Sequence, residues 1–405
     1  MKGESLPAGR QGRNVHLPFV YRLSEHWYSE LIIMKKSLYI HIPFCQSRCG
    51  YCDFYTTIYK RNIAVSFVSV LVEQIKKLDY NFETIYVGGG TPTILDIDLI
   101  EKLLKELKRL TGAVKEFTIE ANPDSLSEGK LKLFSNYSVN RISIGCQSFN
   151  KRKLDFLDRA HSVKQALEAI EKAKKSGFNN ISIDLIYGLP AESYKVWQKD
   201  LDRAIKLPVT HLSAYMLTYE KGAPLYESLR AGEFLPLASA KAAWMYKQLI
   251  DQLAKNNFFQ YEISNFSKKK FEAIHNLRYW ENKPYIGLGP SAVSFSGGKR
   301  QRNISCLPKY IKAVRKQEKI WEYSEKLSPP AAAKETAALK IRTKEGIDFS
   351  WFRQKTGFNF LEIEREVLPL LLKQKLIKYG QGSRKRIKLT RKGFLFADTV
   401  SATFL

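Results

Sequence analysis

The sequence predicts an α/β protein built around parallel strands, with a smaller α+β module at its C-terminal end. Three observations lead to this prediction. The chain has 405 residues, 44% of them hydrophobic and 12% aromatic, which excludes a disordered or collagen-like chain and predicts a packed core. Short β-branched or apolar runs alternate with amphipathic segments of helical length before about residue 220. Segments rich in Gly, Pro or polar residues follow these runs, where βα barrels carry their functional residues.

The expected strands and helices alternate along the first half of the chain. Strands are expected at 37–41, 84–87, 116–120, 141–145, 180–185 and 211–215. Between them, apolar residues recur every three or four positions, which predicts helices over 65–78, 97–110, 163–176 and 194–205. This order favours parallel strands joined by right-handed helical crossovers. No G-x-G-x-x-G follows the first strand, so we expect a partial (β/α)6 TIM-like barrel rather than an open dinucleotide-binding fold.

The rest of the sequence divides at a compositional break over residues 327–330. Before it lie a helical pattern over 237–256 and an aromatic and polar stretch over 261–295. After it come a helical region, a short hairpin whose strands at 376–378 and 386–389 flank Gly380 to Gly382, and a closing helix. The expected domains are an N-terminal extension at 1–33, a barrel at 34–295, a linker at 296–330 and a winged-helix-like domain at 331–405.

The chain carries a large excess of positive charge, with 66 Lys and Arg against 40 Asp and Glu and a net charge of +26. Lysine-rich helix faces are commonly solvated surfaces, and charge alone cannot choose between nucleic acid, an anionic membrane surface and a small polycarboxylate as partner. A basic hairpin, Arg384 to Arg386, could bind nucleic acid, but a wing of this kind more often packs on its own barrel. We therefore expect no nucleic-acid partner.

Cysteine content and the first residues indicate the compartment. Five cysteines are too few for a disulfide scaffold, no apolar run approaches the ~18 residues of a membrane span, and residues 1–33 lack the features of a secretory signal. These observations predict a soluble protein of the reducing cytoplasm, with Met34 as a second possible start. Cys146 and Cys306 are expected to be small buried residues.

The other three cysteines form the strongest local motif. Cys45, Cys49 and Cys52 make a C-x3-C-x2-C in the loop after the first strand. Three thiolates can hold three irons of a [4Fe–4S] cluster and leave the fourth iron open. An open iron can chelate S-adenosylmethionine and pass one electron into its sulfonium, with the cofactor carrying the chemistry. The alternative is structural zinc, which is normally coordinated by four protein ligands and would require His41 as the fourth.

Together with other motifs, the cysteines make the sequence recognisable. They occur in order with Gly-Gly-Gly-Thr-Pro-Thr at 88–93, Glu-Ala-Asn-Pro at 120–123, Gly-Cys-Gln-Ser-Phe at 145–149 and Asp-Leu-Ile-Tyr-Gly-Leu-Pro at 184–190. Over residues 36–400 the chain resembles the radical SAM family of oxygen-independent coproporphyrinogen III oxidase, and within it the branch of heme chaperones. The resemblance implies a radical SAM barrel. The chain departs from the family pattern at Cys146, Asp158 and the Glu192–Ser193 pair.

The resemblance also implies which residues bind cofactors. Residues at the positions that contact a first S-adenosylmethionine are Tyr39, Gly89 and Glu120. Those that match contacts to a second molecule are Tyr51, Gly90, Thr91, Gln147, Arg159 and Asp184. Taken without the resemblance, Gly88 to Gly90 is a plain turn in which the backbone can approach a ligand, and Arg159 can form a helix-surface ion pair with Asp155.

A second motif, His275 to Trp280, matches the H-N-x-x-Y-W pattern that the resemblance associates with heme. If this segment is helical, His275 and Tyr279 lie one turn apart on the same face. Imidazole can ligate heme iron, and aromatic rings can lie against a porphyrin. On its own, a histidine beside aromatics is more often a packed, hydrogen-bonded core residue.

Two functions remain open. The first is a heme chaperone that binds heme and hands it to a membrane-associated acceptor hemoprotein. The second is an oxygen-independent coproporphyrinogen III oxidase. The oxidases of the resembled family carry a further cysteine two positions after the third, where this chain has Phe54, so the chaperone is preferred. A homodimer is possible.

Overall fold

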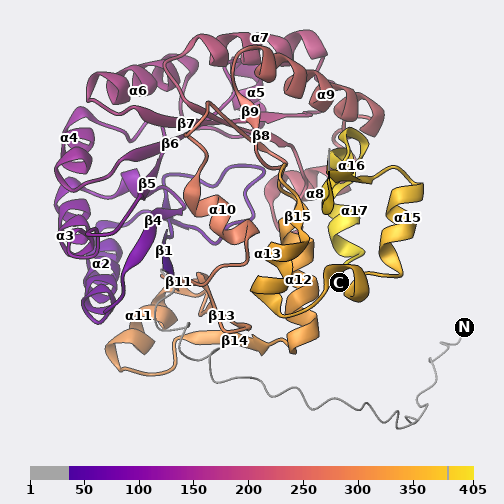
Figure 1. Ribbon diagram of the computed structural model, residues 1–405. Coiled ribbons are helices and arrows are strands. Elements are labelled where there is room, and N and C mark those ends of the chain that lie inside the picture. The colour runs from indigo at the N-terminus through magenta and orange to yellow at the C-terminus, as the bar shows by residue number, and fades with distance from the viewer. Residues whose placement is uncertain (1–35, 381–382) are drawn as a thin grey trace, which may run out of the picture. The chain divides into compact units, whose positions relative to one another are not determined.

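Figure 1 shows the computed structural model, which describes residues 36–380 and 383–405. The expectations for residues 1–33 and for a start at Met34 therefore lie outside the described residues. The described residues all belong to one compact unit, so the barrel and the C-terminal module pack together.

A 12-stranded sheet dominates the described residues, and its central strands run parallel in the order β11, β1, β4, β5, β6, β7, β8. The six strands expected from the sequence are all present, as β1 (Lys36–Ile42), β4 (Phe82–Gly89), β5 (Glu116–Ala121), β6 (Arg141–Gln147), β7 (Asn180–Tyr187) and β8 (His211–Met216). A further strand, β11 (Tyr285–Leu288), was not expected and pairs in parallel with β1. The partial TIM-like barrel is confirmed.

Helices cover the outer face of the parallel strands in Figure 1. They are α2 (Arg61–Lys76), α3 (Ile97–Lys108), α4 (Glu128–Asn136), α5 (Lys151–Phe156), α6 (Val163–Lys175), α7 (Tyr194–Lys206), α8 (Pro224–Arg230) and α9 (Ser239–Lys255), with the 3-10 turn η1 (Pro92–Ile94). Their buried residues follow the predicted spacing; α3, for example, buries Leu99, Leu103 and Leu107. Ser162 and Gln165 form a capping box, which fixes the start of α6 at Val163.

The sheet stays open, with β14 and β9 at its edges. Antiparallel strands extend it on both sides: β12 (Val293–Ser296), β13 (Lys299–Asn303) and β14 (Trp321–Lys326) beyond β11, and β10 (Asn265–Ser267) and β9 (Phe259–Gln260) beyond β8. Helix α11 (Leu307–Arg315) connects β13 to β14. Residues 296–330, expected as a linker, thus contain two strands and a helix. These strands are rich in charged residues, so the pattern of hydrophobic residues does not predict them.

The C-terminal module combines helices with a three-stranded sheet, as expected for a winged-helix-like α+β unit. Its elements are α12 (Pro329–Lys340), β15 (Ile347–Asp348), α13 (Phe349–Thr356), α14 (Phe360–Ile363), α15 (Val367–Lys373), β16 (Ile377–Gly380), β17 (Ser383–Leu389), α16 (Arg391–Leu395) and α17 (Ala397–Ala402). The predicted hairpin is β16 paired with β17, with Ile377 opposite Leu389. Phe352, Phe360 and Phe404 fill the core of the module.

Helix α10 (Ile274–Trp280) contacts both strand β4 of the barrel and α12 of the C-terminal module. Its start is fixed by Glu116 of β5, whose carboxylate oxygens accept the backbone N–H groups of Ile274 at 2.7 Å and His275 at 3.2 Å. A carboxylate accepts hydrogen bonds from the unpaired amides at a helix N-terminus, and its negative charge interacts favourably with the positive end of the helix dipole. The helical prediction for this motif is confirmed, and the helix is anchored to the barrel.

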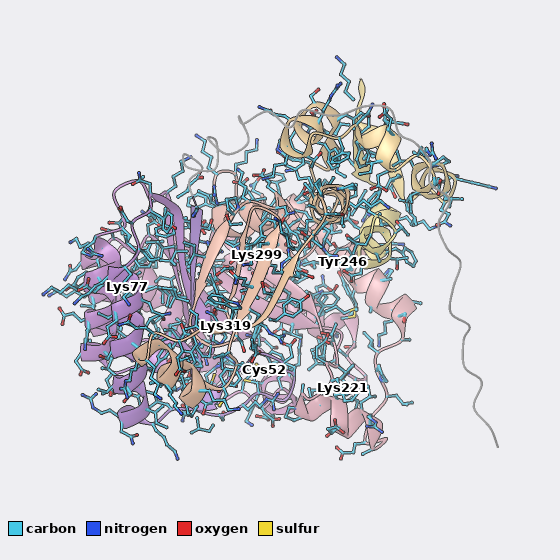
Figure 2. The ribbon with its side chains drawn as sticks, turned by 90° about the horizontal axis from the view of Figure 1, so that it is seen from below. Cys52, Lys77, Lys221, Tyr246, Lys299 and Lys319 are labelled. Carbon is cyan, nitrogen blue, oxygen red and sulfur yellow. The ribbon has the colours of Figure 1, made fainter. Side chains whose placement is uncertain are left out.

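The surface charge is spread over several elements. Figure 2 labels Lys77 after α2, Lys221 before α8, Lys299 on β13 and Lys319 before β14, and all four are exposed. Charge distributed in this way is typical of a solvated surface. Within residues 36–380 and 383–405, no helix is both long and apolar enough to cross a membrane.

Candidate functional site

The three motif cysteines lie in the loop that follows β1. Cys45 ends the short strand β2 (Phe44–Cys45), which pairs with β3 (Thr57–Ile58), and the amide of Cys52 donates to the carbonyl of Cys49 at 3.2 Å. All three are free, partly buried thiols. Burial raises the pKa of Cys45 to about 11, against a weaker lowering by its contact with Thr91. Cys146 is buried as expected, whereas Cys306 is exposed at the start of α11, so that expectation was wrong.

The cysteine loop fits an iron–sulfur cluster better than zinc. His41, the fourth ligand that zinc would need, uses both ring nitrogens elsewhere: Nε2 donates to the carbonyl of Tyr55 at 2.9 Å, and Nδ1 lies 3.1 Å from the hydroxyl of Tyr39. Three thiols on one short loop are the donor set of an open [4Fe–4S] cluster.

The glycine-rich segment at the end of β4 binds the cysteine loop to the barrel. The amide of Gly90 donates to the carbonyl of Ile42 at 2.8 Å, and the amide of Thr91 donates to that of Phe44 at 2.7 Å. A Cβ on Gly90 would lie 2.7 Å from the Phe44 oxygen and 3.0 Å from Cys45 Sγ, so a side chain is excluded there. Gly90 is therefore required by close backbone contacts beside the cysteines.

Glu120 is the penultimate residue of β5, next to this segment. Its carboxylate accepts the hydroxyl of Tyr86 at 2.6 Å and the amide of Gly89 at 3.1 Å. Burial is the main reason that its pKa rises to about 7, with a smaller contribution from Asp184, while the hydrogen bond from Tyr86 opposes the shift. Gly89 has φ of +106° and a Cβ there would lie 2.5 Å from His41, so it too requires glycine.

Arg159 connects the cysteine loop to the ends of β5 and β6. Its Nη1 lies 3.2 Å from Cys49 Sγ and 3.5 Å from the hydroxyl of Tyr51, and its Nη2 donates to Asn122 at 2.8 Å and to the carbonyl of Gly145 at 2.9 Å. Asp155 pairs with Lys151 instead, at 2.7 Å. The helix-surface ion pair considered from the sequence is therefore absent, and Arg159 points into the barrel.

The predicted residues fall into two adjoining groups at the carboxyl ends of the strands. One contains Tyr39, Gly89 and Glu120; the other contains Tyr51, Gly90, Thr91 and Arg159 around the cysteines. Gln147 and Asp184 follow on β6 and β7, and Gln147 has a positive φ of 61°. Burial is the main cause of a raised pKa at Asp184, opposed by a hydrogen bond from Ser213.

His275 lies apart from both groups. It is 1% exposed, its Nδ1 lies 2.8 Å from the hydroxyl of Thr84, and its Nε2 lies 3.0 Å from the hydroxyl of Tyr279. Burial first, and then the charge of nearby arginines, lowers its pKa to about 3. Its ring also packs on Tyr86, which bonds Glu120, so His275 is linked to the cofactor groups through one aromatic side chain.

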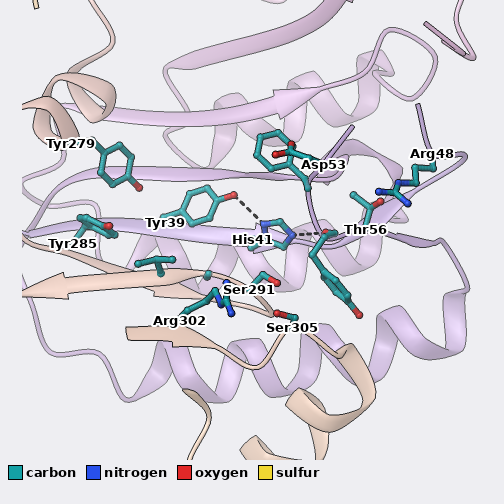
Figure 3. Close-up of a pocket in the computed structure, with 14 residues that line it drawn as sticks. Tyr39, His41, Arg48, Asp53, Thr56, Tyr279, Tyr285, Ser291, Arg302 and Ser305 are labelled. Carbon is teal, nitrogen blue, oxygen red and sulfur yellow. Dashed lines mark hydrogen bonds between the residues drawn. The ribbon is translucent and has the colours of Figure 1, made fainter. Parts of the chain in front are cut away.

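A cavity of about 630 Å³ opens between the cysteine loop and β11 and β12 (Figure 3). Tyr39 and His41 of β1 form its inner wall, and Tyr279 and Tyr285 lie at the end away from the cysteine loop. Phe54, which the sequence analysis had singled out, also lines the cavity, together with residues that it had not, which include Arg48, Tyr55, Val293 and Arg302. Only the unexpected strand β11 and its antiparallel extension bring the second wall next to the cysteine loop.

Comparisons with known proteins agree with this geometry. Residues 39–204 match the radical SAM superfamily and residues 327–396 match the HemN C-terminal domain. The chain is 35% identical to the heme chaperone HemW of Lactococcus lactis over 372 residues, covering 91% of this chain and 97% of that protein. It belongs to the HemW family of radical SAM proteins. The HemW of Bacillus subtilis is 32% identical over 378 residues, covering 91% of this chain and 99% of its own length.

The fold of this HemW family member also has a solved relative. The structure of Escherichia coli coproporphyrinogen III oxidase (HemN), described as a radical SAM enzyme, superposes with a TM-score of 0.79 at 22% identity and covers 94% of this chain and 93% of that one. This likeness confirms the barrel and the C-terminal domain as one fold. The family implies a [4Fe–4S] cluster and S-adenosylmethionine, and the three loop thiols are the donor set for that cluster.

Proposed function

We propose that this chain is a heme chaperone, which binds heme as cargo in the cavity beside its cysteine loop and transfers it to an acceptor hemoprotein. The observation that carries the proposal is the cavity itself. It is bounded by the cysteine loop on one side and by Tyr279 of the His275–Trp280 motif on the other. The names of the curated relatives support the same function.

The cysteine loop would hold the cluster through Cys45, Cys49 and Cys52. When bound, the cluster supplies an open iron for S-adenosylmethionine and an electron for its sulfonium. The guanidinium of Arg159 places a positive charge 3.2 Å from Cys49 Sγ, beside the proposed cluster ligands. Burial lowers the pKa of Arg159, but electrostatic interactions with Tyr51 and Cys49 outweigh this effect, so that its pKa is raised overall.

S-adenosylmethionine would be bound by the group around Glu120. Tyr39, Gly89 and Glu120 converge next to the cysteine loop, and the Glu120 carboxylate accepts the amide of Gly89. A second molecule would be bound by Tyr51, Gly90, Thr91, Gln147, Arg159 and Asp184. The orphaned Nε of Arg159, which is buried without a partner among the described residues, supports an anionic ligand there.

Heme fits the chemistry of the cavity. A volume of about 630 Å³ lies within the range of sites for ligands of this size. Tyrosine rings offer surfaces for a porphyrin, and the guanidinium groups of Arg48 and Arg302 match its carboxylates. Phe54, which stands where the oxidases of the family have a further cysteine, lines the same cavity and is 61% exposed. This position supports the chaperone over the oxidase.

The acceptor and the setting are proposed on chemical grounds. Each of the five cysteines, all within the described residues, is a free thiol, which supports the reducing cytoplasm. The exposed Phe54 in the cavity lining supports an apolar contact with a membrane-associated acceptor hemoprotein or with a second copy in a homodimer.

The test compares cargo binding with turnover in one anaerobically reconstituted preparation. Heme is titrated into the protein, and coproporphyrinogen III is incubated with the same protein, S-adenosylmethionine and a reductant. We expect saturable heme binding and no decarboxylated product. Product formation at a rate above that of the triple cysteine-to-alanine variant would contradict the proposal.

A further inference from the structure

His275 and Tyr279 lie one turn apart on α10, and their other partners fix the direction of the hydrogen bond between them. The Oγ of Ser37 accepts hydrogen bonds from Nε of Arg278 at 2.6 Å and from the hydroxyl of Thr84 at 2.8 Å. The single hydrogen of Thr84 is therefore used on Ser37. The Thr84 oxygen must accept at its 2.8 Å contact with His275, so Nδ1 of the ring is the donor.

The remaining ring nitrogen of His275 is then an acceptor. The imidazole is buried and neutral, so it carries one N–H, and that N–H lies on Nδ1. Nε2 accepts the phenol hydrogen of Tyr279 across 3.0 Å. Both nitrogens of His275 are thus engaged with protein atoms, and the ring does not line the cavity.

Tyr279, in contrast, lines the cavity. Figure 3 shows its hydroxyl end directed toward Tyr39, across the space in front of β1. The ring is held edge-on by Tyr285, with centroids 4.6 Å apart at 88°, and by His275, with centroids 4.9 Å apart at 87°. Its hydrogen points to His275, so the lone pairs of the phenol oxygen are left for a ligand in the cavity.

We propose that the phenol oxygen of Tyr279 is the axial ligand of ferric heme in this cavity, and that His275 is a positioning residue for it. The inference rests on the proposed function and refines the role expected for His275. Tyrosine is an established ligand of ferric heme. When the Fe–O bond forms, the phenol O–H bond breaks and its proton passes to Nε2 of His275, while the iron stays ferric. Burial disfavours the charged ring, and the new phenolate across the 3.0 Å contact offsets its positive charge.

The cavity contains a second pair of the same kind, which offers the alternative phenol ligand that the experiment has to distinguish. Nε2 of His41 donates to the carbonyl of Tyr55, so Nδ1 accepts the hydroxyl of Tyr39 at 3.1 Å. Tyr39 belongs to the group beside Glu120 that is proposed to bind S-adenosylmethionine. Tyr39→Phe removes a phenol from the same cavity without touching the proposed heme ligand.

The experiment titrates ferric heme into anaerobically reconstituted wild type, Tyr279→Phe, Tyr39→Phe and His275→Gln, and records absorbance and electron paramagnetic resonance spectra. We expect a high-spin ferric signal with a phenolate charge-transfer band in wild type and Tyr39→Phe. Tyr279→Phe loses the band and binds at least tenfold more weakly. His275→Gln keeps the band with weaker binding. Iron and sulfide content equal to that of wild type shows that each variant is folded.

The outcomes separate this inference from the function on which it rests. A wild-type spectrum of imidazole ligation overturns the inference even if every variant fails to fold. A band that survives in Tyr279→Phe, or that disappears in Tyr39→Phe, overturns it as well. If wild type does not bind heme at all, the proposed function fails, whereas heme binding without phenolate ligation removes the assignment of Tyr279 alone.

Discussion

Replacing Lys153 by methionine removes the cation from a buried ionic cluster that holds two functional loops in place. Lys153 Nζ lies 2.6 Å from Glu192 and 2.9 Å from Asp200, and all three side chains are almost fully buried. The second oxygen of Glu192 accepts the amide of Gly188 at 2.7 Å, and that of Asp200 accepts the amide of Phe149 at 2.8 Å. The cluster therefore joins the loops after β6 and β7.

The size of the effect follows from burial. Removing one partner from a buried ion pair leaves an uncompensated charge and typically costs about 3–5 kcal/mol. Here two carboxylates lose their shared cation, so we expect a cost of about 4 kcal/mol and a clear decrease in the urea midpoint of unfolding. Asp184 and Gln147 lie on these strands, so S-adenosylmethionine affinity should decrease as well.

A control lies on the same helix. Lys151 pairs with Asp155 at 2.7 Å, but its side chain is 83% exposed, and exposed pairs contribute about 1 kcal/mol or less. Lys151→Met and Lys153→Met are compared by urea unfolding followed by circular dichroism. Equal midpoints for the two variants would refute the reasoning from burial.

Three further predictions concern the cysteine loop and its neighbours. Alanine at all three loop cysteines should abolish iron binding and the brown absorbance of the reconstituted protein; iron content equal to wild type would show that the cluster lies elsewhere. Glu120→Gln should weaken S-adenosylmethionine binding by roughly tenfold, because a hydrogen-bonded buried carboxylate is lost. Folding raises the pKa of Glu120 from 4.5 to about 7, so the folded state is favoured while Glu120 is neutral. As pH rises from 4.5 to about 7, wild type should therefore lose stability relative to Glu120→Gln. Thermal unfolding at several pH values measures this difference. Gly90→Ala should lower cluster content because its Cβ meets backbone oxygen, whereas Gly112→Ala, with open space around it, should match wild type in iron assays.

The barrel could be predicted from local sequence because each strand and helix has its own periodicity. All six expected strands are present, and the helix of the His275–Trp280 motif begins at Ile274. Strand β11 has four residues in an irregular region, and its parallel pairing with β1 joins residues about 250 positions apart. Local patterns carry no information about such pairing, so the second wall of the cavity was missed.

The cysteine site was predictable from spacing, but the environment of His275 was not. The motif places His275 and Tyr279 on one face of a helix, and the structure confirms this. Contacts with Thr84 of β4 and Ser37 of β1, which are far away in sequence, determine which of these two side chains lines the cavity. Similarly, Arg159 could pair with Asp155 on a helix surface, and only the fold directs it toward Cys49.

The central claim, that heme occupies the cavity beside the cysteine loop, is tested most directly by filling that cavity. Val293 of β12 lines it, and Ser296 on the same strand is exposed and does not. Heme is titrated into wild type, Val293→Trp and Ser296→Trp. The account predicts one heme per chain with equal affinity in wild type and Ser296→Trp, and at least tenfold weaker binding in Val293→Trp. Unchanged heme affinity in Val293→Trp would contradict it.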